Sequence, residues 1–562
     1  MSDQRAERLA DDYWAYHRST AQFWNIDRGD VEQIAHWEDL SPVGVAERVQ
    51  RLGEFAKSAE ALAATVTDDN ARAITAAVGF SARANAATLP YVRDVTLVAG
   101  MFNLTEFLTT MVPGYRLTTR RHGEGYVGKL RAFPSFVEGW MAGLREGARV
   151  GRVATARGVA RIVAELDAML VVDPSQDALA GQLPPDELSE RESSGWRADV
   201  VEAIAGDIRP ALTRLRAMLH DEILPIARPD ERAGICHLAG GAEDYEALLH
   251  AATSTHLGSD RVHEIGLNCV AMLEDEYRQR GPTALGVDDP VELRARLRDD
   301  PELRYATSEE IMADASAALS RAQRTAPGWF SRLPAAPCTA AATSGPAMAY
   351  YTAPSPDGAR GGTFFYGVAD PSAWTRFNLE VTTFHESVPG HHLQIALALE
   401  LDLHPVLGEL EVTSYGEGWG LYAERLADEM SLYSGPLQQL GMLTLDSMRA
   451  ARLVVDTGLH ARGWTRDQAI DYLADNTALT RASATGEIDR YIADPGQATS
   501  YMIGRIELER LRIHAADRLG SRFRLVDFHD AVLGGGMMPL DALAESIDSW
   551  IESRPDPAQP VH

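Results

Sequence analysis

Apolar residues recur at three- and four-residue spacings along most of this 562-residue chain, and this helical period constrains the fold more than any other feature. Residues 45–66 and 156–172 show the period clearly, and both are rich in alanine, leucine, arginine and glutamate, which favour helices. A third stretch, 307–323, has acidic residues in its first turn after Ser308, which we expect to cap the helix. The sequence therefore predicts a mostly α-helical protein.

Residues 335–370 depart from this pattern because they are rich in glycine and proline. They contain two aromatic runs typical of β-strands, AYYTA at 349–353 and GTFFYGV at 362–368, separated by the turn-forming segment PSPDGARG. This arrangement predicts a small β-ribbon near 345–368. The ribbon directly precedes the part of the chain with the densest candidate chemistry.

The polar, proline-bearing segment 173–196 interrupts the helical pattern, and we expect it to be a surface excursion or a linker. It separates an N-terminal helical region, 1–172, from a longer region, 197–562, that holds the candidate catalytic residues. At about 150 residues per domain, a chain of this length forms two to four domains or one large helical domain. The whole chain could equally be one compact domain with two lobes.

Charge and apolar content exclude several classes of partner. The chain has 53 basic and 81 acidic residues, a net charge of −28, and no basic stripe, so we expect no nucleic acid partner. Its three cysteines are too few and too far apart for a disulfide framework or a thiolate zinc site. The N-terminus lacks the apolar core of a signal peptide, and no apolar run reaches about 18 residues. The sequence therefore predicts a cytoplasmic protein that does not span a membrane.

The densest cluster of candidate catalytic residues is the segment HESVPGHHLQ, residues 385–394. In the HExxH motif of zinc hydrolases, two histidines on one helix face bind the metal, and the glutamate takes a proton from the zinc-bound water. His385 and Glu386 fit that pattern, so we predict a metal ligand and a general base. Pro389 occupies the position of the second histidine and interrupts the helix locally.

Two later histidines, His391 and His392, could supply the second ligand. On a straight helix, His391 would lie about 240° around from His385, whereas His392 would return to the same face about 10 Å higher. A bulge or widened turn at Pro389 and Gly390 would bring His391 towards His385. We therefore predict His391 as the ligand, and His392 as an alternative ligand or as a group that orients the site or faces the substrate.

Catalytic zinc normally has a third protein ligand, and the segment VTSYGEGWGLYAERLADEM offers two glutamates. Glu417 and Glu424 are seven residues apart, so both carboxylates lie on one helix face. The neighbouring Trp419 and Tyr422 indicate that this helix is packed rather than solvated. We predict Glu417, at the helix start, as the third ligand and Glu424 as a residue that orients a ligand.

The segments HESVPGHHLQ and YGEGWGLYAERLADEM together resemble the bacterial domain-of-unknown-function 885 family, and RYIADPGQATSYMIGRIELERLR extends the resemblance towards the C-terminus. That family is similar to the helical zinc peptidases that include angiotensin-converting enzyme and the carboxypeptidase Taq group. The resemblance implies a large helical zincin-like architecture with a deep cleft. It also implies a third ligand about two dozen residues after the second histidine, and Glu417 stands 26 residues after His391.

The same resemblance implies an oxyanion donor. The helical peptidases use a tyrosine from a C-terminal helix, and Tyr501 is the best match. Arg505, one turn later, could bind a substrate carboxylate, and Gln497 lies one turn earlier. We predict both as substrate-binding residues, together with Tyr351 of the ribbon, which either pairs with an extended peptide or covers the zinc helix.

The sequence therefore predicts an enzyme, a zinc metallopeptidase with one Zn²⁺ per chain that acts on short peptides. It would resemble a carboxypeptidase if Arg505 binds a terminal carboxylate. The same residues could serve a hydrolase of non-peptide amides, and the ligand set also admits iron, cobalt or manganese. A further alternative is a helical binding or scaffold protein with a structural or lost metal site, which the retention of Glu386 beside His385 disfavours.

Overall fold

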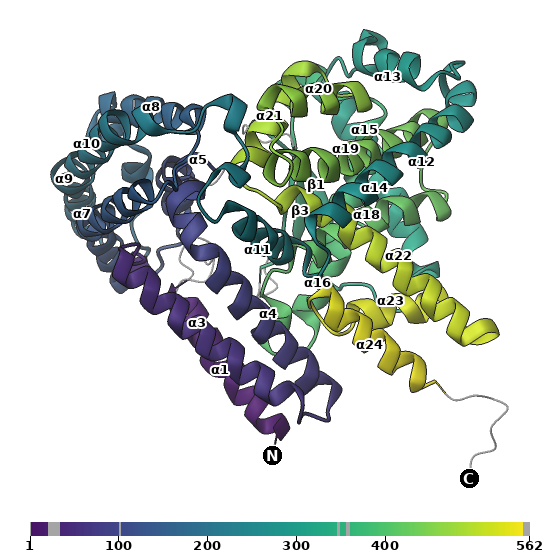
Figure 1. Cartoon of the computed structure of the whole chain (residues 1–562), viewed down its shortest axis with the longest axis horizontal. Helices are drawn as coiled ribbons and strands as arrows, with labels where there is room; N and C mark the ends of the chain where they lie inside the picture. Colours follow the sequence, from purple (N-terminus) through teal and green to yellow (C-terminus); the bar gives the residue numbers. More distant parts are fainter. Residues whose placement is uncertain (1, 21–33, 101–102, 345–348, 356–359, 555–562) are drawn as a thin grey trace.

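Helices make up most of the protein, as the sequence predicts. The computed structural model describes residues 2–20, 34–100, 103–344, 349–355 and 360–554. The N-terminal helices, drawn purple to blue, form one side of the molecule, and the later helices, drawn teal to yellow, form the other (Figure 1). Helix α11 (Gly241–Thr253) lies between the two sides and packs against α4 (Asp69–Tyr91).

The N-terminal side contains three helices, α1 (Ser2–Thr20), α3 (Pro42–Ala63) and α4, that pack against one another, and a second group of helices that includes the long α7 (Arg120–Arg149). In the first group, Tyr13, Phe55 and Ile74 share one apolar core. Besides these four, the helices of this side are α5 (Leu97–Ala99), α6 (Leu104–Glu106), α8 (Ala156–Val171), α9 (Glu190–Ala203) and α10 (Arg209–Met218). Helices α3 and α8 correspond closely to the periodic stretches in the sequence.

The polar segment 173–196 packs onto this side of the molecule. It forms two 3-10 turns, Pro174–Gln176 and Ala178–Gly181, and then enters α9. Leu179 is fully buried, and its carbonyl oxygen accepts a hydrogen bond of 2.9 Å from the Tyr126 hydroxyl of α7. Leu179 thus holds the first part of this mostly polar segment against α7.

The C-terminal side is built around α19 (Pro436–His460), whose residues from Leu440 onward are almost all buried. The other helices of this side are α12 (Ser259–Leu285), α13 (Pro290–Asp299), α14 (Ser308–Thr325), α15 (Asn378–Glu386), α16 (His391–Glu400), α17 (Pro405–Gly408), α18 (Thr413–Glu429), α20 (Arg466–Asn476), α21 (Arg481–Ala493), α22 (Ser500–Leu519), α23 (Leu525–Leu533) and α24 (Leu540–Glu552). Among them, α12 and α15 pack against α19, and α18 packs against α22.

The cap of α14 differs by one residue from the sequence prediction. Thr307, not Ser308, is the N-cap, because its side chain accepts a hydrogen bond from the backbone N–H of Glu310. Both residues have a hydroxyl that can cap a helix, and the sequence alone does not distinguish them.

The ribbon is part of a three-stranded sheet made of β1 (Cys338–Thr343), β2 (Ala349–Thr352) and β3 (Gly362–Gly367). The strand order is β1-β3-β2, with β2 antiparallel and β1 parallel to β3. Strands β2 and β3 are the two predicted aromatic runs, while part of the predicted turn, 356–359, lies outside the described residues. Strand β1 could not be predicted from the same pattern, because its alanines and threonines lack the aromatic residues of the other two strands.

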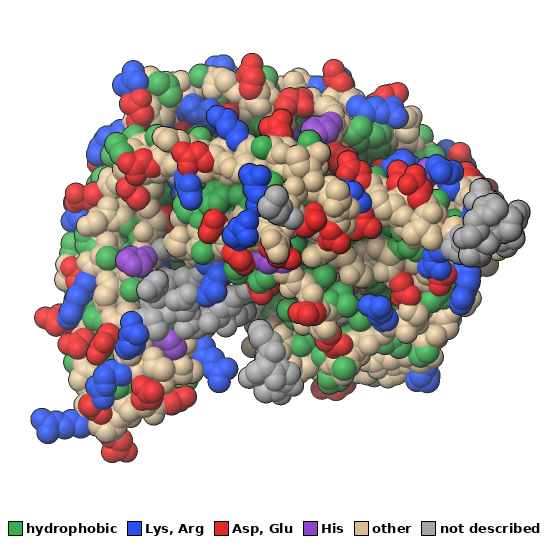
Figure 2. Space-filling view, turned by 90° about the horizontal axis from the view of Figure 1, so that it is seen from below, with side chains coloured by type: hydrophobic (Ala, Val, Ile, Leu, Met, Phe, Trp, Pro, Cys, Tyr) green, Lys and Arg blue, Asp and Glu red, His purple; other side chains and the backbone are tan. Residues whose placement is uncertain are grey.

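Acidic side chains are dispersed on one face of the molecule. On the face shown in Figure 2, Asp and Glu side chains are interspersed with Lys and Arg.

Within the described residues, no single helix is long and apolar enough to cross a membrane, although one bent pair, Asp69–Ala99 with Leu104–Gly114, meets the criteria of length and composition.

Candidate metal centre

The helix is completely interrupted between His385 and His391, whereas the sequence predicted a bulge within one helix. Helix α15 ends at Glu386 and α16 begins at His391, with a cis peptide bond between Val388 and Pro389. Gly390 allows the break to be tight, since a Cβ atom at this position would overlap the carbonyl oxygen of His385. The chain therefore turns back sharply enough for the two histidines to face each other.

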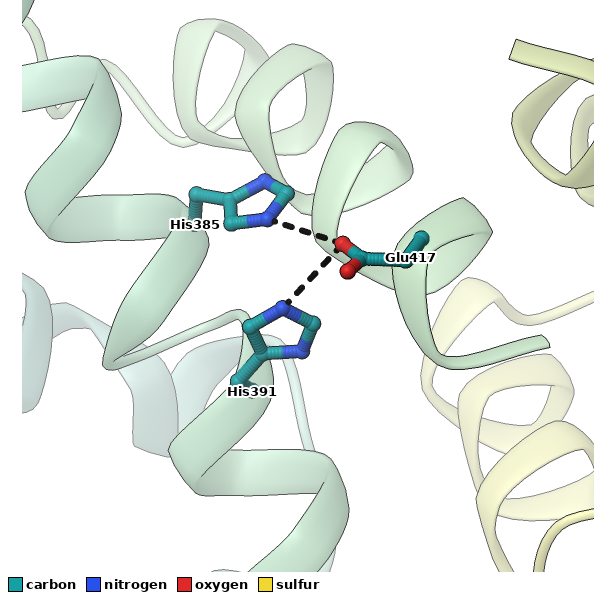
Figure 3. Close-up of side chains that lie close together, drawn as sticks. All are labelled: His385, His391 and Glu417. Atoms are coloured by element: carbon teal, nitrogen blue, oxygen red, sulfur yellow. Dashed lines mark ion pairs between the residues drawn. The ribbon is translucent and has the colours of Figure 1, made fainter. Parts of the chain in front are cut away.

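His385, at the end of α15, and His391, at the start of α16, converge on Glu417 of α18 (Figure 3). The Nε2 atoms of both histidines lie 3.4 Å from the same carboxylate oxygen, Oε2 of Glu417. The two imidazole rings are nearly perpendicular, at 84°, with their centroids 4.6 Å apart. One ligand atom from each of the three residues lies within 4.8 Å of the others. The structure thus brings together the three predicted ligands.

Glu424 holds the other side of the His385 ring. Its Oε1 atom is 2.8 Å from His385 Nδ1, and its side chain is fully buried. Because a carboxylate accepts hydrogen bonds, Glu424 holds a proton on Nδ1, and Nε2, which faces Glu417, is the nitrogen that could bind a cation in exchange for its proton. Glu424 therefore has the position expected of a residue that orients a ligand.

The backbone of α18 lies directly against this ring. Gly420 is one turn from both glutamates, and a Cβ atom at this position would lie 2.8 Å from the Nδ1 and Nε2 atoms of His385. The Trp419 indole donates a hydrogen bond of 2.9 Å to the carbonyl oxygen of Pro389, which ties the same helix to the break. Two contacts of α18 thus define the place of the first histidine.

The charges in the cluster stabilise one another. Burial alone would lower the pKa of His385, but Glu417 and Glu424 outweigh burial and raise this pKa to about 10. Burial alone would raise the pKa of Glu417, but its contacts with His385 and His391 hold this pKa well below the usual range. The carboxylate is therefore ionised at neutral pH, which is the form that binds a cation.

His392 points away from this cluster and towards the sheet. Its Nδ1 atom is 2.8 Å from the Tyr351 hydroxyl, and its Nε2 atom is 3.1 Å from the carbonyl oxygen of Ala336. Burial lowers its pKa, so the ring is neutral at neutral pH. The structure therefore does not bring His392 to the other ligands, and it connects the strand that contains Tyr351 to helix α16.

A cavity of about 600 Å³ opens at the cluster. Among the residues predicted as catalytic or substrate-binding, Glu386, Tyr351 and Tyr501 line this cavity beside the three ligand candidates. Burial raises the pKa of Tyr501 to about 12, so its hydroxyl keeps its proton at neutral pH. The edge strand β2 contributes further to the cavity wall.

The structure does not bring Arg505 and Gln497 to the cavity. Arg505 is 8% exposed, and its Nη1 donates a hydrogen bond of 2.6 Å to Asp446 within the core. The side-chain oxygen of Gln497 accepts a hydrogen bond of 2.7 Å from Arg490. Arg505 is therefore part of a buried ion pair, because on α22 it faces α19 rather than the cavity.

Two arginines that the sequence analysis missed line the cavity instead. Arg449 and Arg452 are three residues apart on the buried helix α19, and both contribute to the cavity wall. Their guanidinium carbons lie 5.9 and 4.9 Å, respectively, from the centre of the Tyr501 ring. Helix α19 also contains Asp446 and Asp456, so the sequence holds no local signal that sets these two arginines apart from the other charged residues of the helix.

Comparisons with known proteins agree with this fold. The family model described as "Bacterial protein of unknown function (DUF885)" matches residues 23–547. A crystal structure of "the putative lipoprotein from Colwellia psychrerythraea" is 23% identical, with a TM-score of 0.87 over 99% of this chain and 100% of that one. A second structure, "a putative lipoprotein of unknown function from Shewanella oneidensis", is 16% identical, with a TM-score of 0.75 over 97% and 99% of the two chains. No curated protein matches the chain. The two solved structures thus share the fold.

Proposed function

The chain belongs to the DUF885 family of bacterial proteins of unknown function, so its activity has to be inferred from the site, and we propose that it is a zinc-dependent hydrolase of peptide bonds. One observation carries the proposal. His385, His391 and Glu417 offer three ligand atoms within 4.8 Å of one another, and Glu386 lines the same cavity directly after the first histidine.

The three residues fit a zinc ion in number and in chemistry. Two imidazole nitrogens and one carboxylate are the ligands of several catalytic zinc sites, where a fourth position stays open for water or substrate. Glu424 directs the Nε2 atom of His385 towards the other two ligands. Glu417 Oε2 is buried, and no hydrogen bond to it is formed by the residues that the structure describes, so a cation at this point would find an available acceptor.

Each cavity residue then has a distinct task. Zinc, when bound, supplies the Lewis acidity that activates water and polarises a carbonyl group at neutral pH. Glu386 accepts the proton from the attacking water and returns it to the leaving amine. The Tyr501 hydroxyl, which stays protonated, donates a hydrogen bond to the carbonyl oxygen as negative charge develops there.

The edge of the sheet favours an extended peptide as the substrate. Strand β2 pairs with β3 and is an edge strand among the described residues, and its residues Ala349, Tyr350 and Tyr351 line the cavity. An edge strand offers backbone N–H and C=O groups to a peptide that adds itself to the sheet. This geometry would place a peptide bond beside Glu386.

Metal analysis tests the first part of the proposal. We expect about one zinc per chain in the wild-type protein and in His392→Ala, and loss of zinc in His385→Ala. His392 is the matched control because it is also a buried histidine of the same segment, but contacts Tyr351 instead of the cluster. Absence of bound metal in the wild type after zinc is added back would refute the proposed site.

Peptide hydrolysis tests the second part. Glu386→Gln should retain zinc and lose about 10²- to 10⁴-fold in kcat, because a positioned general base contributes that much. Glu264→Gln is the control, since Glu264 also follows a histidine but pairs with Arg261 on the surface. Equal rates of Glu386→Gln and the wild type on a peptide library would contradict the mechanism.

A further inference from the structure

Side chains of both charge signs line the cavity. Four glutamates line it, and two of them, Glu386 and Glu417, belong to the proposed catalytic centre. Among the lining residues that the structure describes, the basic side chains other than histidine are Arg449 and Arg452 of α19. A substrate that extends from the catalytic centre towards α19 therefore meets two guanidinium groups.

The two arginines differ in how their hydrogen-bonding capacity is used. Arg452 donates from Nε to the Tyr491 hydroxyl, at 2.6 Å, and from Nη2 to Glu487, at 2.9 Å. Arg449 is 7% exposed, yet its Nε and Nη1 atoms are buried without a hydrogen-bond partner among the described residues. Its Nη2 atom lies 3.5 Å from Glu424 Oε1, which is the atom that already contacts His385.

A buried guanidinium with unused donors is unfavourable unless a ligand supplies the acceptors. Arg449 and His385 contact the same oxygen atom of Glu424, so the unused donors lie close to the proposed metal ligands. One extended residue spans about 3.5 Å, so an anionic group bound here belongs to a residue next to the scissile amide, or to the one after it. The carboxylate at the end of a short peptide satisfies this requirement.

We propose that Arg449 binds the free carboxylate of the substrate, and that the enzyme therefore acts on amides followed closely by a carboxylate. This inference rests on the proposed hydrolase function and specifies its substrate class. The class includes peptides with a free C-terminus and N-acylated amino acids, which share the same group beyond the amide. Arg452, with its charge already paired by Glu487, supports the site by fixing the Tyr501 ring.

The test compares substrates that differ only in this charge. Short peptides with a free C-terminus, the same peptides with a C-terminal amide, and N-acetylated amino acids are incubated with zinc-loaded protein. Wild type should hydrolyse at least one of the two free acids with a kcat/KM about 10- to 100-fold above that of the amidated peptide, the range expected for hydrogen bonds to a charged group. The better of the two free acids identifies the source of the carboxylate.

Arg449→Gln should bring this acid-to-amide ratio close to one while it retains zinc, and Arg449→Lys should retain part of the preference. Arg505→Gln is the matched control, because Arg505 is equally buried and its Nε also lacks a hydrogen bond among the described residues, but Arg505 does not line the cavity. Its ratio should equal that of the wild type even if its stability falls. Equal rates on acid and amide in the wild type, or an unchanged ratio in Arg449→Gln, would overturn the inference.

A binding measurement separates this inference from the hydrolase proposal. Calorimetry with N-acetylphenylalanine and its amide, on protein with and without zinc, reports carboxylate recognition without any reaction. If no peptide is cleaved but the acid binds and Arg449→Gln loses this binding, the carboxylate site stands and the hydrolase proposal fails. If peptides are cleaved but the acid binds no better than the amide, the carboxylate site fails alone.

Discussion

A single methyl group on α18 should displace His385, the first of the proposed zinc ligands. In Gly420→Ala, the new Cβ atom would overlap Cε1 of His385 and lie 2.8 Å from its Nδ1 and Nε2 atoms, whereas ordinary contacts of this kind are about 3.5 Å or longer. The ring would have to retreat by more than roughly 0.7 Å, which exceeds the tolerance of about 0.2 Å in metal–ligand distances. His385 has little freedom to compensate, because it is 4% exposed and bonded to Glu424.

We therefore expect Gly420→Ala to weaken zinc binding by at least the 10- to 100-fold that follows when a ligand loses its orienting partner. Gly416→Ala is the matched control on the same helix, one turn earlier, because a Cβ atom there meets nothing within 4 Å. Its zinc affinity should equal that of the wild type. Competition with a chromophoric chelator measures both affinities.

The same pair of variants gives a measurement that needs no metal. Alanine in place of glycine favours a helix by about 1 kcal/mol, while overpacking costs about 1 to 3 kcal/mol. The helix preference is gained in both variants, so only the overpacking cost separates them, and urea unfolding should find Gly416→Ala more stable than Gly420→Ala by about 1 to 3 kcal/mol. Equal stabilities together with equal zinc affinities would refute the close contact between α18 and the His385 ring.

Three further predictions concern single groups. Glu424→Gln should weaken zinc binding about 10- to 100-fold by chelator competition, whereas Asp428→Asn, which removes a carboxylate bonded to Arg280 one turn further along α18, should not. Tyr501→Phe should lower kcat about 10²- to 10³-fold with little change in KM, as removal of an oxyanion donor does; an equal effect on KM alone would contradict that role. Burial lowers the pKa of His529 from 6.5 to about 4, so its contribution to stability is complete above pH 6.5 and is lost as the pH falls towards 4. Unfolding free energies of wild type and His529→Gln between pH 7 and pH 4 should diverge in slope over that window.

The helical class and the identities of the clustered residues could be predicted from the sequence. Both depend on local patterns: the apolar period that defines α3 and α8, and the short spacings that join His385 to Glu386 and Glu417 to Glu424. A seven-residue spacing on one helix sets the direction of two carboxylates wherever the helix lies. The structure accordingly brings both glutamates to opposite nitrogens of one imidazole ring.

The choice between the two adjacent histidines depended on a backbone geometry that the sequence only suggested. Pro389 and Gly390 indicated a distortion, but a bulge and a complete break are both compatible with them. The break arises because Gly390 lies against the carbonyl oxygen of His385, with Trp419 of a different helix bonded to Pro389. His391 then faces Glu417 while His392 faces Tyr351.

Tertiary structure alone determines which arginine side chains line the cavity. Arg449, Arg452 and Arg505 all lie on helices whose sequences alternate apolar and charged residues, and nothing local tells which guanidinium faces a cavity. Asp446 lies on α19, yet pairs with Arg505 of α22 and Arg425 of α18. Such pairs join segments far apart in the chain, so local periodicity predicts that a residue is on a helix, and only the packing of helices determines what its side chain meets.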